Sequence, residues 1–172
     1  HPANGEKITF TAPPDFAEDQ RQALRRAFID PAATTAYGLI HGAADGPPGL
    51  YVDRLGDFIL AQSERPLTPT QQAVVGACAH RAKARGVYHK LLDRQARAMP
   101  QKISGETAPD EISIYENGVQ YALRFDEGYS VGLFLDQRNN RRRFLTHYIA
   151  PKLELPAAPA VLNAFAYTCG FS

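Results

Sequence analysis

The chain has 172 residues, of which 44% are hydrophobic and 22% charged, and its formal net charge at pH 7 is +1. This length allows one ordinary domain and the edge of a second, and the composition is typical of a globular protein rather than a disordered one. No apolar run reaches the roughly 18 residues of a membrane-spanning helix and no signal segment opens the chain, so we expect a cytoplasmic protein. The near-neutral charge means that any interaction with nucleic acid must depend on local clusters of basic residues. The two cysteines, Cys78 and Cys169, are far apart, which excludes a disulfide framework and a CxxC metal site.

The first half of the chain predicts a helix followed by a small antiparallel meander. Asp15 and Glu18 form a capping-box pattern for a helix that runs to about Phe28, and Asp30-Pro31 ends it. Three apolar segments bounded by turn residues then follow, and they predict strands at 37–41, 50–53 and 58–62.

The middle of the chain predicts a second helix, a strand and a hairpin. Thr68, Pro69 and Gln71 combine an N-cap, a first-turn proline and a capping-box glutamine. We expect this helix to end at Gly86 and to turn Val74, Val75, Cys78 and Ala82 inward. A strand is expected at 87–92, a loop through Pro109, and a hairpin of 112–115 with 119–125 around the turn 116–118.

The last third predicts a helix from Asp136 to about Ile149, a proline-rich linker at 151–159 and a short strand at 161–165. The expected fold class is α+β: a small antiparallel sheet with packed helices, followed by the first strand of another unit. This gives three parts: an N-terminal helical lead at 1–35, a central α+β domain at 36–135, and a linker helix with the start of a further domain at 136–172. Both ends of the chain are interpreted as cuts within a longer protein.

The sequence VLNAFAYTCGFS at 161–172 places an apolar strand directly before a small turn that contains Gly170. A cofactor that approaches the backbone closely at the carboxyl end of the first parallel strand needs such a turn, because side chains larger than glycine would block it. One glycine after one strand is also a common ordinary turn, so both interpretations stay open on this segment alone.

Four arginines follow Asp136 closely: Arg138, Arg141, Arg142 and Arg143. The helix macrodipole disfavours cations in the first turns of a helix, so their presence indicates either a bound anion or pairing with Asp126, Glu127 or solvent. We favour solvent for Arg142 and Arg143. Arg138 is the preferred functional arginine, because it shares a helix face with Arg141, Leu145 and Tyr148.

Other polar residues favour structural roles. His41 and Asp45 lie beside turn residues, and Asp53-Arg54 is interpreted as a structural ion pair. Cys169 could act as a nucleophile towards a cytosine base, but its place in the glycine turn makes this unfavourable. Cys78 is expected to pack in the core. No metal ligand set and no catalytic residue is predicted.

Three segments together resemble the large-subunit ribosomal RNA methyltransferase I family. They are YGLIHGAADGPPGLYVDRLGDFILAQ at 37–62, GYSVGLFLDQRNNR at 128–141 and LNAFAYTCGF at 162–171. Pro47 stands where the family usually has leucine, and Cys169 where it often has glycine.

The resemblance implies a protein of three parts: an RNA-binding domain, a central α+β domain and a Rossmann-like methyltransferase domain that begins near the end of this chain. It implies transfer of a methyl group from S-adenosylmethionine to a base of ribosomal RNA, and homodimerisation. The implied cofactor-binding residues are Gln137, Arg138, Phe165, Tyr167, Thr168 and Gly170. The chain alone is expected to be inactive. The alternative is a non-catalytic module for RNA binding or dimerisation.

Overall fold

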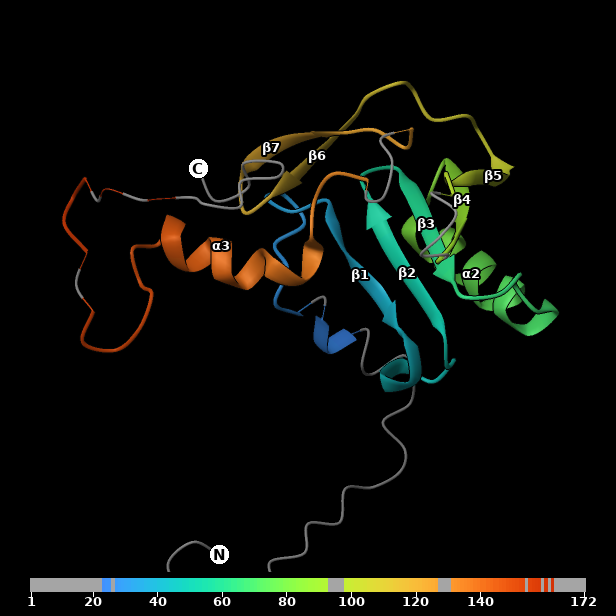
Figure 1. Ribbon diagram of the computed structural model, residues 1–172, viewed down its shortest axis with the longest axis horizontal. Helices are drawn as coiled ribbons and strands as arrows, with labels where there is room; N and C mark the ends of the chain where they lie inside the picture. Colours follow the sequence, from blue (N-terminus) through green and yellow to red (C-terminus); the bar gives the residue numbers. More distant parts are fainter. Residues whose placement is uncertain are drawn as a thin grey trace, which may run out of the picture.

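The computed structural model describes residues 23–25, 27–92, 98–126, 131–153, 155–158, 160 and 162. Their elements, drawn in Figure 1, are β1 (Ala36–His41), η1 (Gly42–Asp45), β2 (Leu50–Leu55), β3 (Phe58–Ser63), α2 (Pro69–Ala82), β4 (Gly86–Leu91), β5 (Gln101–Gly105), β6 (Ile112–Glu116), β7 (Val119–Leu123), η2 (Leu135–Gln137) and α3 (Arg138–Leu145). Before β1, residues 23–25 and 27 are helical and a turn follows at Phe28, where the sequence predicts the end of the first helix.

Strands β1 to β5 form one sheet in which spatial order equals chain order. The meander β1–β2–β3 is antiparallel as predicted. The expectation of a wholly antiparallel sheet is wrong, because β3 and β4 pair in parallel. A parallel pair needs a crossover connection, and α2 provides it. The fold is therefore a mixed α/β arrangement with few helices.

Helix α2 begins as its sequence predicts. The Thr68 side chain accepts a hydrogen bond from the Gln71 backbone amide, while the Gln71 side chain accepts one from the Thr68 amide. The predicted end at Gly86 is wrong: Lys83 ends the helix in the left-handed conformation, with φ of 52°. Gly86 is instead the first residue of β4, where a Cβ atom would collide with the carbonyl oxygen of Glu106.

Apolar side chains pack on both faces of the sheet. On one face, β-strand residues pack under α2, in a cluster that contains Ile40, Leu50, Val52, Ile59, Ala61, Val75, Cys78 and Val87. On the other face, the hairpin β6–β7 covers a second cluster of Ala36, Leu55, Phe58, Leu60, Tyr88, Ile112, Ile114, Leu123 and Leu133. The prediction that Cys78 packs in the core is confirmed.

The hairpin β6–β7 confirms the strongest turn pattern in the sequence. Asn117 and Gly118 both have positive φ, at 51° and 83°, which the tight turn between antiparallel strands requires. Backbone amides of Tyr115 and Asn117 donate to the side chains of Thr35 and Thr34. These bonds attach the hairpin to the segment that precedes β1.

Two predicted elements differ from the structure. The predicted loop before Pro109 contains β5, an edge strand with all five residues exposed, so its side chains show no burial pattern. The predicted cap at Asp136 is also wrong. Asp136 lies in the short helix η2, α3 starts at Arg138 without a side-chain cap, and α3 ends at Leu145 rather than near Ile149. Apart from Leu162, which is exposed and not in a strand, the predicted strand at 161–165 lies outside the described residues, as does most of the first predicted helix.

Candidate functional site: a groove between the sheet and α3

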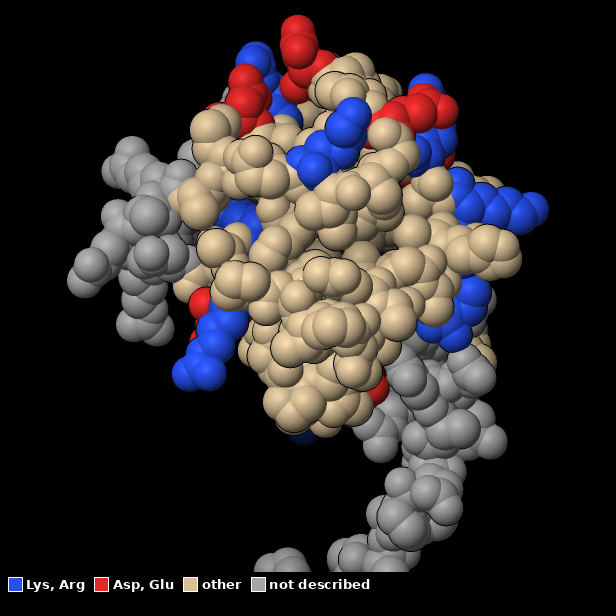
Figure 2. All heavy atoms as spheres, turned by 90° about the vertical axis from the view of Figure 1, so that its right-hand side faces the viewer, with Lys and Arg blue, Asp and Glu red and all other residues tan. Residues whose placement is uncertain are grey.

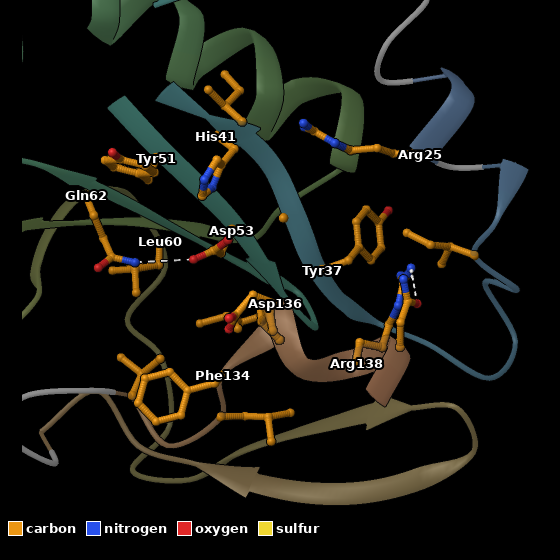
Figure 3. A pocket seen from close by; sticks show the side chains of 18 of the residues that line it. Arg25, Tyr37, His41, Tyr51, Asp53, Leu60, Gln62, Phe134, Asp136 and Arg138 are labelled. Atoms are coloured by element: carbon orange, nitrogen blue, oxygen red, sulfur yellow. Dashed lines mark hydrogen bonds between the residues drawn. The ribbon is translucent and has the colours of Figure 1, made fainter. Parts of the chain in front are cut away.

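The sheet face opposite α2 is covered at one end and open at the other. The hairpin covers the apolar end, whereas polar side chains of β1, β2 and β3 continue beyond it. Segment 131–135, η2 and α3 border this open end and complete a groove with a volume of about 1490 Å³. Figure 3 shows the groove with Asp53 on its floor, His41 and Tyr51 on one side, and Asp136 and Arg138 on the other.

Asp53 is the central polar group of the floor. Strand alternation places it on the same face as its cross-strand partners Gly38 and Leu60. The Gln62 side-chain amide donates to its carboxylate over 3.2 Å. Desolvation raises the pKa of Asp53 to about 6, and the negative charge of Asp136 also raises it, against the opposing effects of Gln62 and His41.

This pKa predicts a pH-dependent stability. In the unfolded chain Asp53 has its ordinary pKa of 3.8, whereas in the folded chain its pKa is about 6. The folded state therefore binds more protons over this window, so stability falls as pH rises from about 4 to about 6 and the loss persists above it. We compare the unfolding free energy of Asp53→Asn with that of wild type at each pH. This difference should shift in favour of the variant by roughly 1–3 kcal/mol between pH 4 and pH 7.5. Urea unfolding at the two pH values tests this, and an equal difference at both would contradict it.

The first turn of α3 is fixed by a buried ion pair. Arg141 donates to Glu116 through Nε at 2.6 Å and Nη2 at 2.8 Å, and both side chains are at least 95% buried, with exposed fractions of 5% and 1%. Arg141 also donates to the carbonyl oxygen of Phe134, and Asn117 donates to that of Arg138. The hairpin turn thereby holds the start of α3 at the edge of the groove. Arg141 is thus a positioning residue, a role that the sequence did not reveal.

Gln137 and Arg138 lie at this edge. Arg138 is half-buried, lines the groove, and donates to its neighbour Asn139 over a long 3.4 Å. Gln137 accepts from Asn140 and donates to Asp136. The exposed Arg142 and Arg143 also line the groove. Of the two acidic partners considered for this cluster, Asp126 pairs with Arg124, and Glu127 lies outside the described residues. The other predicted cofactor residues, Phe165, Tyr167, Thr168 and Gly170, lie outside the described residues, as does Cys169.

The structural role predicted for Asp45 is confirmed. Its buried carboxylate accepts from the Arg25 guanidinium and from the backbone amide of His41, and Arg25 also donates to Leu39 at the bulge in β1. The predicted Asp53–Arg54 ion pair is wrong. Adjacent strand residues point to opposite faces, and Arg54 lies near the Tyr37 ring and donates to the Gly56 carbonyl oxygen.

The face of the molecule that carries α2 has a different character. Figure 2 shows charged side chains of both signs around an uncharged centre. Helix α2 itself contributes one arginine, Arg81, to its last turn. The arginines of α3 border the groove instead, so the groove is the better candidate for an anionic ligand. Among the described residues, no helix is long and apolar enough to cross a membrane and no group of metal-ligand side chains occurs.

Two solved structures that superpose on this chain are candidate methyltransferases. A candidate methyltransferase complexed with SAH superposes with a TM-score of 0.67 at 26% identity, over 90% of this chain and 37% of that one. A candidate SAM-dependent methyltransferase from Streptococcus mutans superposes with a TM-score of 0.59 at 27% identity, over 76% of this chain and 33% of that one. No family model matches the chain.

The curated relatives carry a more specific name than the solved structures do. Ribosomal RNA large subunit methyltransferase I of Aliivibrio fischeri is 31% identical over 159 residues, which are 89% of this chain and 38% of the relative. The protein of the same name from Cronobacter sakazakii is 34% identical over 80% of this chain and 34% of its own length. The chain is thus homologous to a segment of the ribosomal RNA large subunit methyltransferase I family, and it spans little more than a third of those relatives. The resemblance seen in the sequence is confirmed.

Proposed function

We propose that this chain is part of an S-adenosylmethionine-dependent methyltransferase that acts on a base of large-subunit ribosomal RNA. The observation that carries the proposal is the identity of about 30% to methyltransferases of that name over most of the chain. The neighbour complexed with SAH supports the choice of cofactor. Nothing in these relatives favours the alternative of a non-catalytic RNA-binding or dimerisation module.

The described part of the groove fits an anionic end of this cofactor. The Arg138 guanidinium lines the groove, and within the part of the chain that the structure describes its one side-chain hydrogen bond is the long contact with Asn139, so it retains donors for a carboxylate. The Arg141–Glu116 pair holds the backbone beneath it in place. In the proposal, Gln137 and Arg138 support the cofactor, and Phe165, Tyr167, Thr168 and Gly170 begin its pocket, as the resemblance implies.

The cofactor supplies an electrophilic methyl group, and the protein's task is to align it with the acceptor base. Holding two reactants in line can contribute on the order of 7–11 kcal/mol to lowering the barrier. The residues of this chain would act by positioning, with the Arg138 guanidinium at one end of the cofactor. The whole protein would add further parts around this central α+β unit, including the Rossmann-like domain whose first strand is expected at 161–165.

Removing the Arg138 side chain should weaken cofactor binding in the full-length protein. Arg138→Ala deletes a charge-assisted hydrogen bond in a partly buried groove, so we expect the Kd for S-adenosylmethionine to rise at least about tenfold. Calorimetry with S-adenosylmethionine and, separately, with SAH measures this. Gly170→Val should abolish binding, because the added side chain would fill the expected cofactor turn.

A matched control is Arg124→Ala, which removes the same side chain from an exposed ion pair with Asp126. Its Kd should stay within about twofold of wild type. If Arg138→Ala binds the cofactor as tightly as Arg124→Ala does, Arg138 has no role in the cofactor site. If the wild-type full-length protein binds no S-adenosylmethionine, the proposed function is wrong. The 172-residue chain alone should show no saturable binding.

A further inference from the structure

The floor of the groove combines features that recognise a flat, hydrogen-bonding ligand. The Asp53 side chain lines the groove, and Gln62 donates to Oδ2 of its carboxylate, which leaves Oδ1 as the second acceptor. His41 and Tyr51 stand beside it with their ring centroids 5.2 Å apart and their planes at 75°. These residues come from adjacent strands of a sheet rather than from loops, so their relative positions are fixed by the strand register.

The absence of a side chain at Gly38 gives access to this carboxylate. Gly38 pairs with Asp53 across β1 and β2, directly before the bulge in β1. A Cβ atom at Gly38 would lie 3.5 Å from Oδ1 of Asp53, which is ordinary contact distance. A methyl group would therefore fit without strain, but it would cover the oxygen that Gln62 leaves available. Bulges and interior glycines in strands often mark such points of close approach.

The charge around Asp53 indicates what kind of partner it takes. Asp136 faces it from η2, while Arg142 and Arg143, which the cofactor proposal does not use, lie further out along α3 on the groove lining. A ligand that donates hydrogen bonds at its centre and carries negative charge at its periphery matches this pattern. A nucleotide within an RNA strand has this distribution, with amino groups on the base and phosphates on the backbone.

We propose that the groove binds an unpaired, amino-bearing nucleobase of the RNA substrate, with the carboxylate of Asp53 accepting a hydrogen bond from the base amino group. The inference rests on the proposed function, since it names the part of the RNA that this chain holds. Cytosine and adenine fit, because each carries an exocyclic amino donor. Uracil is rejected, because its carbonyl oxygen at the equivalent position would face the carboxylate.

The test compares two single-stranded RNA hexamers, (C)6 and (U)6. Cytosine carries an amino group where uracil has a carbonyl oxygen, and uracil has an additional proton on a ring nitrogen. Binding to the full-length protein is measured by fluorescence anisotropy at pH 7.5. Wild type should bind (C)6 at least about tenfold more tightly than (U)6, the effect of one hydrogen bond to a charged group. In Asp53→Asn the preference should fall below roughly threefold, because the amide can rotate to donate to a carbonyl oxygen.

Two further variants distinguish base recognition by Asp53 from two other effects, the loss of a negative charge and the loss of the folded state. Gly38→Ala keeps every charge but covers Asp53, so it should weaken (C)6 binding and leave (U)6 binding nearly unchanged. Asp57→Asn removes an exposed carboxylate, 62% exposed and outside the groove lining, so it should shift both affinities equally and keep the preference. Thermal unfolding of each variant confirms that it is folded.

A wild-type protein that binds the two hexamers equally, or binds neither, overturns the inference, as does a full preference for (C)6 in folded Asp53→Asn. Cofactor binding and methyl transfer to ribosomal RNA are measured on the same samples. If both persist without a base preference, only the inference fails. If both are absent, the proposed function fails as well.

Discussion

Arg141→Ala is expected to destabilise the folded chain by roughly 3–5 kcal/mol. The substitution removes both guanidinium contacts of Glu116 and leaves a carboxylate whose side chain is 1% exposed without its counter-charge. It also removes the hydrogen bond that Arg141 donates to the carbonyl oxygen of Phe134. Chemical unfolding followed by circular dichroism measures the change.

Arg142→Ala is the matched control for this prediction, because it removes the same side chain from the next position of α3, where it is exposed. Its effect should stay within about 0.5 kcal/mol. The double variant Glu116→Gln with Arg141→Met should lose less than the sum of the single changes, since no buried charge remains. Equal losses in Arg141→Ala and Arg142→Ala would show that the buried pair does not stabilise this fold.

Ile114→Ala should cost roughly 2–5 kcal/mol, as expected for truncation of a fully buried aliphatic side chain. Ile114 is 0% exposed and belongs to the cluster that joins the hairpin to the sheet. Because the hairpin also carries Glu116, its loosening should expose the start of α3, and amide hydrogen exchange in α3 should rise together with exchange in β6. Ser113→Ala, on the exposed face of the same strand, is the control. Faster exchange in β6 alone would contradict the coupling.

Elements whose geometry is set by adjacent residues were predicted well from the sequence. The capping box of Thr68 and Gln71 and the turn at Asn117-Gly118 each depend on contacts within a few residues, and both appear as expected. Apolar segments bounded by turn residues placed β1, β2 and β3. Strand β5 was missed because its exposed residues lack alternation, and edge position in a sheet is decided by tertiary structure.

The site was predicted only in part, because its residues meet across long stretches of chain. Arg138 was expected from the cluster of arginines, and it does line the groove. The partner of Arg141 lies 25 residues away on the hairpin, and no local pattern connects the two. Asp53 was assigned to its neighbour Arg54, although strand alternation alone places adjacent side chains on opposite faces. The same alternation along β2 places Asp53 on the face that forms the groove.

The five strands of the sheet lie in the same order in space as in the chain, and this order affects how the protein folds. Each strand from β2 to β5 pairs with the strand made just before it, so the sheet can grow one strand at a time as the chain emerges during synthesis. The bonds of Tyr115 and Asn117 to Thr35 and Thr34 span 80 and 83 residues, so they can close only after the whole sheet has been made. Loop closure over such distances is entropically costly, and the preformed sheet reduces that cost by holding the two segments close together. The groove, whose far wall follows the hairpin in the chain, is therefore the last part of this unit to be assembled.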